Sequence, residues 1–136
     1  MLPRGIRNHN PCNIKKNKTK WQGLKEQQDD PVFFQFERAE DGIRAAARVI
    51  RTYGRKYGIK TIEGLVSRWA PATENATKTY VDFVERYVGI SKDTIIQLDD
   101  PLTVQDLVKA IIHFENGEQP YSGGVIARAV QAGLNG

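Results

Sequence analysis

Glu115 is the residue whose position in the sequence best suits acid–base chemistry. A helix predicted from Thr103 to about Glu115 has an apolar face, and Glu115 occupies the next position on that face. The face consists of Leu107, Val108, Ile111 and Ile112. Burial and the negative C-terminal end of the helix both favour the neutral carboxyl, so we expect a raised pKa, as a general acid requires. The alternative is a carboxylate at a frayed helix end that turns into water.

A second group of chemically capable side chains lies near the N-terminus. It consists of Arg7, Asn8, Asn10, Asn13, Trp21 and Gln22. Amide groups supply paired donors and acceptors, and tryptophan supplies a flat apolar face. Sugar rings with hydroxyl and acetamido groups need both. The alternative is that these asparagines bond their own backbone in turns.

Other candidates are weaker. Cys12 and His9 are two possible metal ligands three residues apart, but a zinc site needs a second pair of ligands and the sequence has none. His113 lies two residues before Glu115 and therefore points away from it on a helix. The segment Arg68 to Asn75 can place the Glu74 carboxylate in a cleft or simply end one helix and start the next. We predict no metal site and no cofactor.

The elements that must position these residues are mainly helical after Glu37. The apolar spacing and the capping residues predict five helices. The first covers residues 39–58, and the second covers Ile62–Trp69 with Thr61 as its cap. The third runs from Thr73 or Asn75 to Gly89. The fourth begins at Thr103 with a Thr103–Asp106 capping box, and the last begins at Ser122.

The first 36 residues have a different pattern, rich in Asn, Lys and Gly. The segments Asn13–Lys16 and Val32–Phe36 are predicted strands, with Trp21–Gly23 as a turn or third strand. We therefore expect one domain over residues 1–136, an α+β fold that is mainly α. It would consist of a basic, loop-rich β lobe (residues 1–36) and a helical lobe (residues 37–136).

Composition and charge limit the function classes. The chain has 136 residues, 40% hydrophobic and 26% charged, which is typical of a globular domain. One cysteine excludes an internal disulfide, and neither a membrane span nor a secretory signal is evident. The net charge is +4, and the first 25 residues hold seven basic and no acidic side chains. This asymmetry indicates a polyanionic partner, such as nucleic acid, an anionic membrane or a bacterial wall, or merely a solvated surface.

Several motifs resemble one group of proteins. The opening RGIRNHNPCNI with Trp21-Gln22-Gly23, the segment RWAPATEN and the later Glu115-Asn116-Gly117 are the residues concerned. They resemble small phage and prophage proteins that are virion-associated or lytic and lysozyme-like, with an RGIRNNNPGNI opening and an RWAPxxEN motif. The resemblance covers nearly the whole chain and implies a lysozyme-like, mostly helical domain that acts on peptidoglycan. The family pattern has Asn and Gly where this chain has His9 and Cys12, so Cys12 is strained if that Gly has a positive φ.

The end of the Glu115 helix is also similar to goose-type lysozymes and lytic transglycosylases. In those enzymes a helix ends in the catalytic Glu and a small β element follows downstream. Here the predicted β lobe precedes the helix. A circular permutation, with the chain ends close together, would restore the order.

These inferences predict a peptidoglycan-degrading glycosidase, a lytic transglycosylase or muramidase, in which Glu115 is both acid and base. Substrate would be held by Arg7, Asn8, Asn10, Asn13, Trp21, Gln22 and Tyr121. The candidates for a second carboxylate are Glu74 and Glu37, with Glu26 and Asp29 less favoured. The expected partner is peptidoglycan, and the protein would be a monomer or part of a virion. It would act on the wall from the phage virion or the host cytoplasm.

Two alternatives remain open. A non-catalytic virion or wall-binding protein could retain the same fold without lytic activity. A nucleic-acid-binding module is suggested by Lys15, Lys16, Lys18 and Lys20, although no recognition helix accompanies them.

Overall fold

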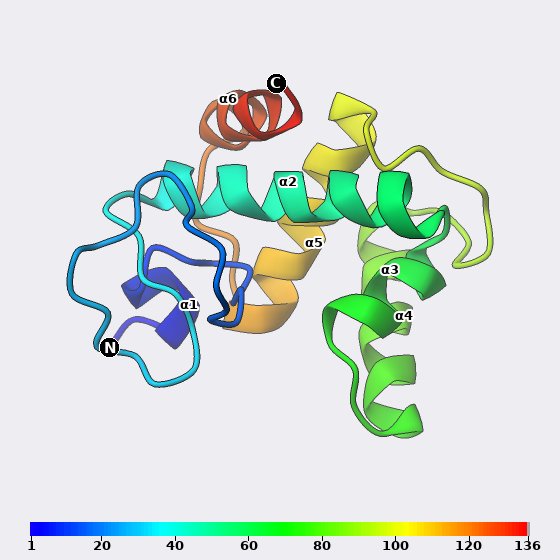
Figure 1. Ribbon diagram of the computed structural model, residues 1–136. Coiled ribbons are helices and arrows are strands. Elements are labelled where there is room, and N and C mark those ends of the chain that lie inside the picture. Colours follow the sequence, from blue (N-terminus) through cyan, green and yellow to red (C-terminus); the bar gives the residue numbers. More distant parts are fainter. Residues whose placement is uncertain (136) are drawn as a thin grey trace.

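The computed structural model describes residues 1–135 and is mainly helical (Figure 1). Its helices are α1 (Arg4–Arg7), α2 (Ala39–Tyr57), α3 (Ile62–Trp69), α4 (Glu74–Val88), α5 (Pro101–Asn116) and α6 (Gly123–Leu134). The segment between α1 and α2, residues 8–38, is a long irregular stretch that we call the N-terminal arm. The predicted dominance of helix is confirmed.

Helix α2 runs through the middle of the molecule, with α6 along one side and α5 crossing on the other (Figure 1). Acidic residues lie in its first turn, and it ends at Gly58 in the left-handed conformation, with φ 65°. Gly133 of α6 lies against the backbone carbonyl of Arg44 and the side chain of Ala47. Only glycine permits this close approach, so the two helices pack backbone to backbone.

The helix caps largely follow the predictions. The side chains of Thr61, Thr73 and Ser122 each accept a hydrogen bond from the first turn of α3, α4 and α6 respectively. The predicted capping box at Thr103 is wrong. Helix α5 begins earlier, at Pro101, and Asp100 caps it by accepting a bond of 2.9 Å from the backbone N–H of Thr103. Proline is favoured in the first turn because backbone N–H groups there have no partner within the helix, so the N–H that proline lacks is not missed.

The apolar core lies where α2, α3, α4, α5 and α6 meet. The predicted inner face of α5 is confirmed, since Leu107, Val108, Ile111 and Ile112 are all fully buried. Burying such side chains provides the main driving force for folding. This rigid body is what holds the N-terminal arm in place.

The predicted β lobe is wrong. Within residues 1–135 the arm forms only two isolated bridges, Lys15 to Phe33 and Leu24 to Phe36, and no strand. Backbone bonds join its segments at scattered points, such as that from the Phe34 N–H to the Ile14 carbonyl at 3.1 Å, and side chains bond further backbone groups. The amide of Asn10 donates to the carbonyls of Ile14 and Phe34 at 3.0 and 2.9 Å.

Asp30 is the second organiser of the arm. Its carboxylate accepts a bidentate pair from Arg4 at 2.7 and 2.8 Å and a bond of 2.9 Å from the Asn8 amide. The backbone N–H groups of Val32 and Phe33 also donate to it. These bonds, the Arg4 pair above all, hold the pKa of Asp30 far below its ordinary value. The arm is therefore tied by buried polar side chains, which strand periodicity does not reveal.

The chain ends lie apart. The N-terminus lies near α1, whereas the C-terminal end of α6 lies on the other side of α2 (Figure 1). The close termini that the circular permutation required are not present. No helix among the described residues is long and apolar enough to cross a bilayer.

Candidate functional site

Glu115 lies in the last turn of α5 and joins three segments that are distant in sequence. Its Oε1 accepts a hydrogen bond of 2.8 Å from the Asn13 amide, and its Oε2 accepts one of 2.9 Å from the Tyr80 hydroxyl. The side chain is half-buried. Each carboxylate oxygen therefore has a fixed neutral donor, one from the N-terminal arm and one from α4.

Asn13 is directed toward Glu115 by its own backbone and by its neighbours. It has a φ of 54°, a left-handed conformation that asparagine tolerates better than most residues. The Asn116 amide donates to the carbonyl of Pro11 at 2.7 Å, and the Trp69 indole donates to that of Cys12 at 3.3 Å. The loop before Asn13 is thus fixed to the ends of both α3 and α5.

Gly5 in α1 lies against the side chains of both Asn13 and Asn116. A Cβ atom there would lie 2.6 Å from the Asn116 Oδ1 and 2.9 Å from the Asn13 Oδ1. Both amide oxygens are buried and have no hydrogen-bond partner within residues 1–135. The two asparagines can reach their positions only because residue 5 has no side chain.

Tyr80 is buried and stacks on Phe114, with ring centroids 3.8 Å apart. Burial, followed by the nearby charge of Glu115, raises the pKa of the Tyr80 hydroxyl well above its ordinary value. The hydroxyl therefore remains a donor to the carboxylate. His113 instead packs against Phe83 and Tyr87, as the helical angle between His113 and Glu115 predicts.

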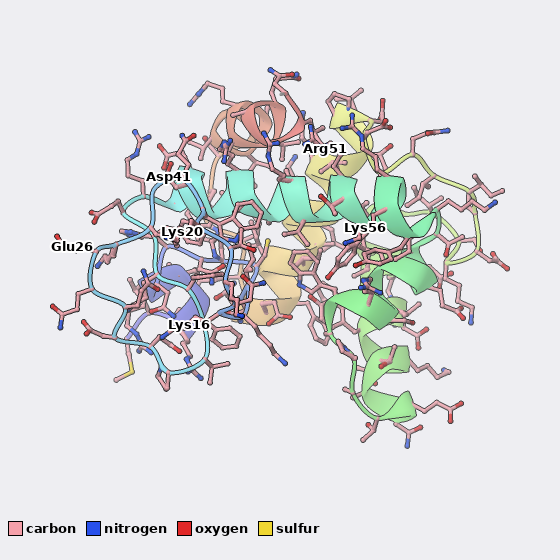
Figure 2. The ribbon with its side chains drawn as sticks, viewed as in Figure 1. Lys16, Lys20, Glu26, Asp41, Arg51 and Lys56 are labelled. Carbon is pink, nitrogen blue, oxygen red and sulfur yellow. The ribbon has the colours of Figure 1, made fainter. Side chains whose placement is uncertain are left out.

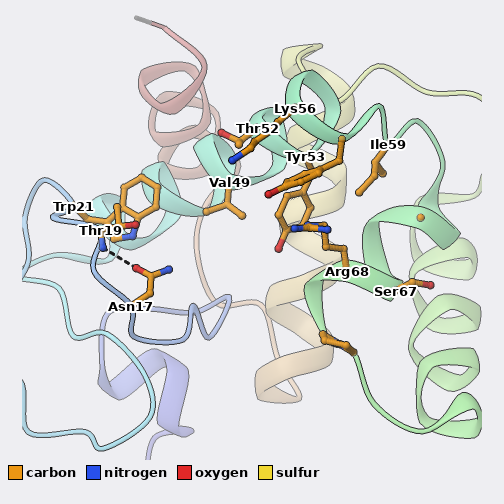
Figure 3. A pocket seen from close by; sticks show the side chains of 13 residues that line it. Asn17, Thr19, Trp21, Val49, Thr52, Tyr53, Lys56, Ile59, Ser67 and Arg68 are labelled. Atoms are coloured by element: carbon orange, nitrogen blue, oxygen red, sulfur yellow. Dashed lines mark hydrogen bonds between the residues drawn. The ribbon is translucent and has the colours of Figure 1, made fainter.

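A groove runs between the N-terminal arm and the helices α2 and α3 (Figure 3). Its wider part has a volume of about 1150 Å³, and a narrower part of about 340 Å³ continues from it. Both parts share the residues Asn17, Trp21, Val49, Tyr53, Arg68 and Pro71. Trp21 and Asn17 lie on one wall, facing Tyr53 and Arg68 on the other (Figure 3).

Asn13 connects the groove to the carboxylate. It lines the narrower part of the groove, together with Trp69. Glu115 itself does not line the groove and lies directly behind Asn13, at hydrogen-bonding distance. The structure therefore places the Glu115 carboxylate behind Asn13, outside the lining of an aromatic-walled groove.

The other predicted sugar-binding residues are distributed differently. Asn8 and Asn10 are buried, and their side chains bond Asp30, Gln35 and the arm backbone. Arg7 and Gln22 are exposed but do not line the groove. Of the predicted set, only Trp21 and Asn13 are brought together at the groove.

Tyr121 is half-buried and does not line the groove. Its hydroxyl is buried without a hydrogen-bond partner in the described chain. Burial, with the nearby Cys12 and Glu118, raises the pKa of Tyr121 to about 12.

The candidate second carboxylates also lie elsewhere. Glu74 is exposed in the first turn of α4, so this part of the motif ends one helix and starts the next. It lines a separate pocket with Lys78 and Lys92. Glu37 is exposed on the arm and does not line the groove, and Glu26 and Asp29 are exposed as well.

Cys12 is fully buried, and burial raises the pKa of its thiol well above the ordinary value, which makes it a poor nucleophile. The non-glycine residues with positive φ are His9 and Asn13, so the strain expected at Cys12 is absent. Residues 1–135 contain no group of three His, Cys, Asp or Glu side chains that could hold a metal ion.

The sequence pattern did not reveal several residues of this site. Tyr80 and Tyr53 lie at positions of helical apolar spacing, which indicate burial, although a tyrosine on such a face also needs a partner for its hydroxyl. Asn17 lies within a lysine-rich stretch and Arg68 near a helix end, and neither position by itself indicates a groove.

Comparisons with known proteins give one informative relative. No protein-family model matches the chain. The chain is 41% identical over 136 residues to Protein P5 of Pseudoalteromonas phage PM2, in an alignment that covers 98% of this chain and 83% of P5. The alignment therefore covers almost all of the described fold, including the arm and the groove. The chain therefore belongs to the family of the phage protein P5.

Proposed function

We propose that this protein cleaves the glycan strand of peptidoglycan between N-acetylmuramic acid and N-acetylglucosamine, with Glu115 as the acid and base. One observation carries the proposal. The Glu115 carboxylate, at the end of α5, lies directly behind Asn13 of the groove lining and accepts hydrogen bonds from Asn13 and Tyr80. The motifs shared with lysozyme-like phage proteins support the same reading.

The groove supplies contacts suited to sugars. The Trp21 and Tyr53 rings offer apolar faces on opposite walls, and Asn17 and Thr19 offer polar groups beside Trp21 (Figure 3). Asn13 would move aside or contact the acetamido group as the strand approaches Glu115.

In the proposed reaction, protonated Glu115 gives its proton to the glycosidic oxygen as the bond from that oxygen to C1 of muramic acid breaks. The resulting carboxylate then takes a proton from the nucleophile. If the nucleophile is water, the product has a reducing end. If it is the C6 hydroxyl of the same sugar, the product is a 1,6-anhydro ring. Since no carboxylate lines the groove in the described chain, the groove offers no second carboxylate beside Glu115, and we favour the second, transglycosylase route.

Membership in the P5 family supports a phage setting. The protein would act on the host wall, either from the virion or from the host cytoplasm. The basic residues near the N-terminus would favour the anionic wall.

Digestion of purified peptidoglycan tests the proposal. The intact protein should release muropeptides, Glu115→Gln should reduce the release by at least about 100-fold, and Glu118→Gln should retain it, since general acid catalysis contributes about 10²- to 10⁴-fold. Glu118 is an exposed carboxylate three residues away and serves as the matched control. Mass analysis separates reducing from anhydro ends. If no preparation releases muropeptides, or if Glu115→Gln remains active, the proposal is wrong.

A second candidate is a non-catalytic virion component. It is favoured by the fact that both Glu115 oxygens already accept bonds from other segments, as in a purely structural contact. In that case Glu115→Gln would lower the unfolding midpoint, and no variant would produce muropeptides.

A further inference from the structure

The groove carries a charge pattern that the cleavage proposal does not use. Two cations, Lys56 and Arg68, line its wider part, and no acidic residue of the described chain does so. Neither cation takes part in an ion pair among residues 1–135. Both are exposed, so their positive charge faces the groove without a carboxylate to neutralise it.

Aromatic rings position these cations. The guanidinium carbon of Arg68 lies 3.5 Å from the centre of the Tyr57 ring and 5.4 Å from that of Tyr53. The Lys56 ammonium lies 5.5 Å from the Tyr57 ring centre. Cation–π contacts of this kind orient a cation while leaving its N–H groups free to bind an anion.

The opposite wall complements this arrangement. Trp21 and Asn17 face Arg68 across the groove (Figure 3). A ligand that spans the groove therefore meets an apolar ring and an amide on one side and positive charge on the other. This combination fits a sugar strand that carries carboxylates better than it fits a neutral one.

We propose that Arg68 and Lys56 form a subsite that recognises carboxylates attached to the glycan, so that the groove selects an acidic strand over a neutral N-acetylglucosamine polymer. This inference rests on the proposed function for the identity of the glycan. In peptidoglycan the carboxylate can belong to the lactyl group of muramic acid or to the attached peptide. The shared chemistry is a carboxylate, and the experiment separates the two sources.

The test measures binding by calorimetry on the Glu115→Gln background, so that no strand is cut. Three probes are compared: soluble peptidoglycan strands with their peptides, the same strands stripped of peptides, and neutral chitohexaose. Both kinds of strand, or the peptide-bearing strand alone, should bind more tightly than chitohexaose. The first result assigns the carboxylate to the lactyl group and the second to the peptide.

Adding the double change Lys56→Gln and Arg68→Gln should remove this preference, with a loss of up to about fivefold for each exposed cation. The matched control is Arg55→Gln with Lys60→Gln, which removes the same charge from a neighbouring pocket. It should leave the preference intact.

Three outcomes would overturn the inference. The first is that chitohexaose binds as tightly as both kinds of strand. The second is that the two double variants lose the same affinity for acidic strands. The third is that a short DNA duplex binds more tightly than the strands and that its binding depends on Lys56 and Arg68. Cleavage is scored separately. A protein that releases no muropeptides yet prefers acidic strands would refute the cleavage proposal and leave this subsite standing, and the converse result would do the opposite.

Discussion

At the scale of single residues, the candidate site depends on neutral hydrogen-bond donors rather than on a charged partner. Asn13 and Tyr80 each donate one bond to Glu115. The two donors come from the arm and from α4, so the position of the carboxylate depends on contacts between segments that are distant in the sequence.

Tyr80→Phe tests one of these donors. The ring keeps its stack on Phe114, but the bond to Glu115 is lost, so we expect a loss of about 1 kcal/mol in the free energy of unfolding. Urea denaturation measures it. Tyr87→Phe, on the exposed part of the same helix, should change stability by less. Equal effects would show that the Tyr80 hydroxyl has no special contact.

Gly5→Ala tests the convergence of the two asparagines. The new Cβ would collide with the amide oxygens of Asn13 and Asn116, and overpacking of this kind typically costs about 1–3 kcal/mol. Thermal and urea unfolding measure the cost. Gly123→Ala is the control, because a Cβ at residue 123 would meet no other side chain or distant backbone atom within 4 Å. A fully stable Gly5→Ala protein would contradict the proposed close approach.

At the scale of elements, the N-terminal arm is a long loop that side-chain hydrogen bonds hold in one conformation. Its only regular pairing consists of isolated bridges, and its shape depends on the network around Asn10 and Asp30. Loops of this length need such internal contacts to stay ordered. The arm must be ordered because it carries both Asn13 and Trp21 to the groove.

The pH dependence of stability should report on Asp30. Its folded pKa is lowered, chiefly by Arg4, so its contribution is fully present above the unfolded pKa of about 3.9 and falls as the pH drops below that value. Asp30→Asn should therefore be less stable than the natural chain at pH 7, and the difference should shrink toward pH 2. Urea midpoints from pH 2 to 7 measure this. A difference that is constant with pH would show that the ion pair contributes nothing.

At the scale of the whole molecule, positive charge lies on both sides of the groove. Lys16 and Lys20 lie on the arm, while Lys56 lies toward the far end of α2 (Figure 2). The sequence placed the excess charge in the first 25 residues. The fold brings Lys15 of this stretch to the groove and adds Lys56 from α2 and Arg68 from α3.

The sequence by itself determined the five helices after Glu37 and most of their ends, but it did not indicate α1. Periodicity identifies the buried face of α5, and left-handed glycines end α2, α4 and α5 where the pattern predicts. These features are local, since they depend on residues within one or two turns of each other. Glu115 was identifiable for the same reason, as a carboxyl at a position that continues an apolar face.

Only the tertiary structure decided what surrounds Glu115 and how the arm is built. Asn13 and Tyr80 lie 102 and 35 residues from Glu115 in the chain, and no local pattern links them. The arm contains residues with high strand propensity, yet part of its backbone bonds to the side chains of Asn10 and Asp30 and no continuous ladder forms. Site geometry depends on how the chain folds back on itself, which local periodicity does not encode.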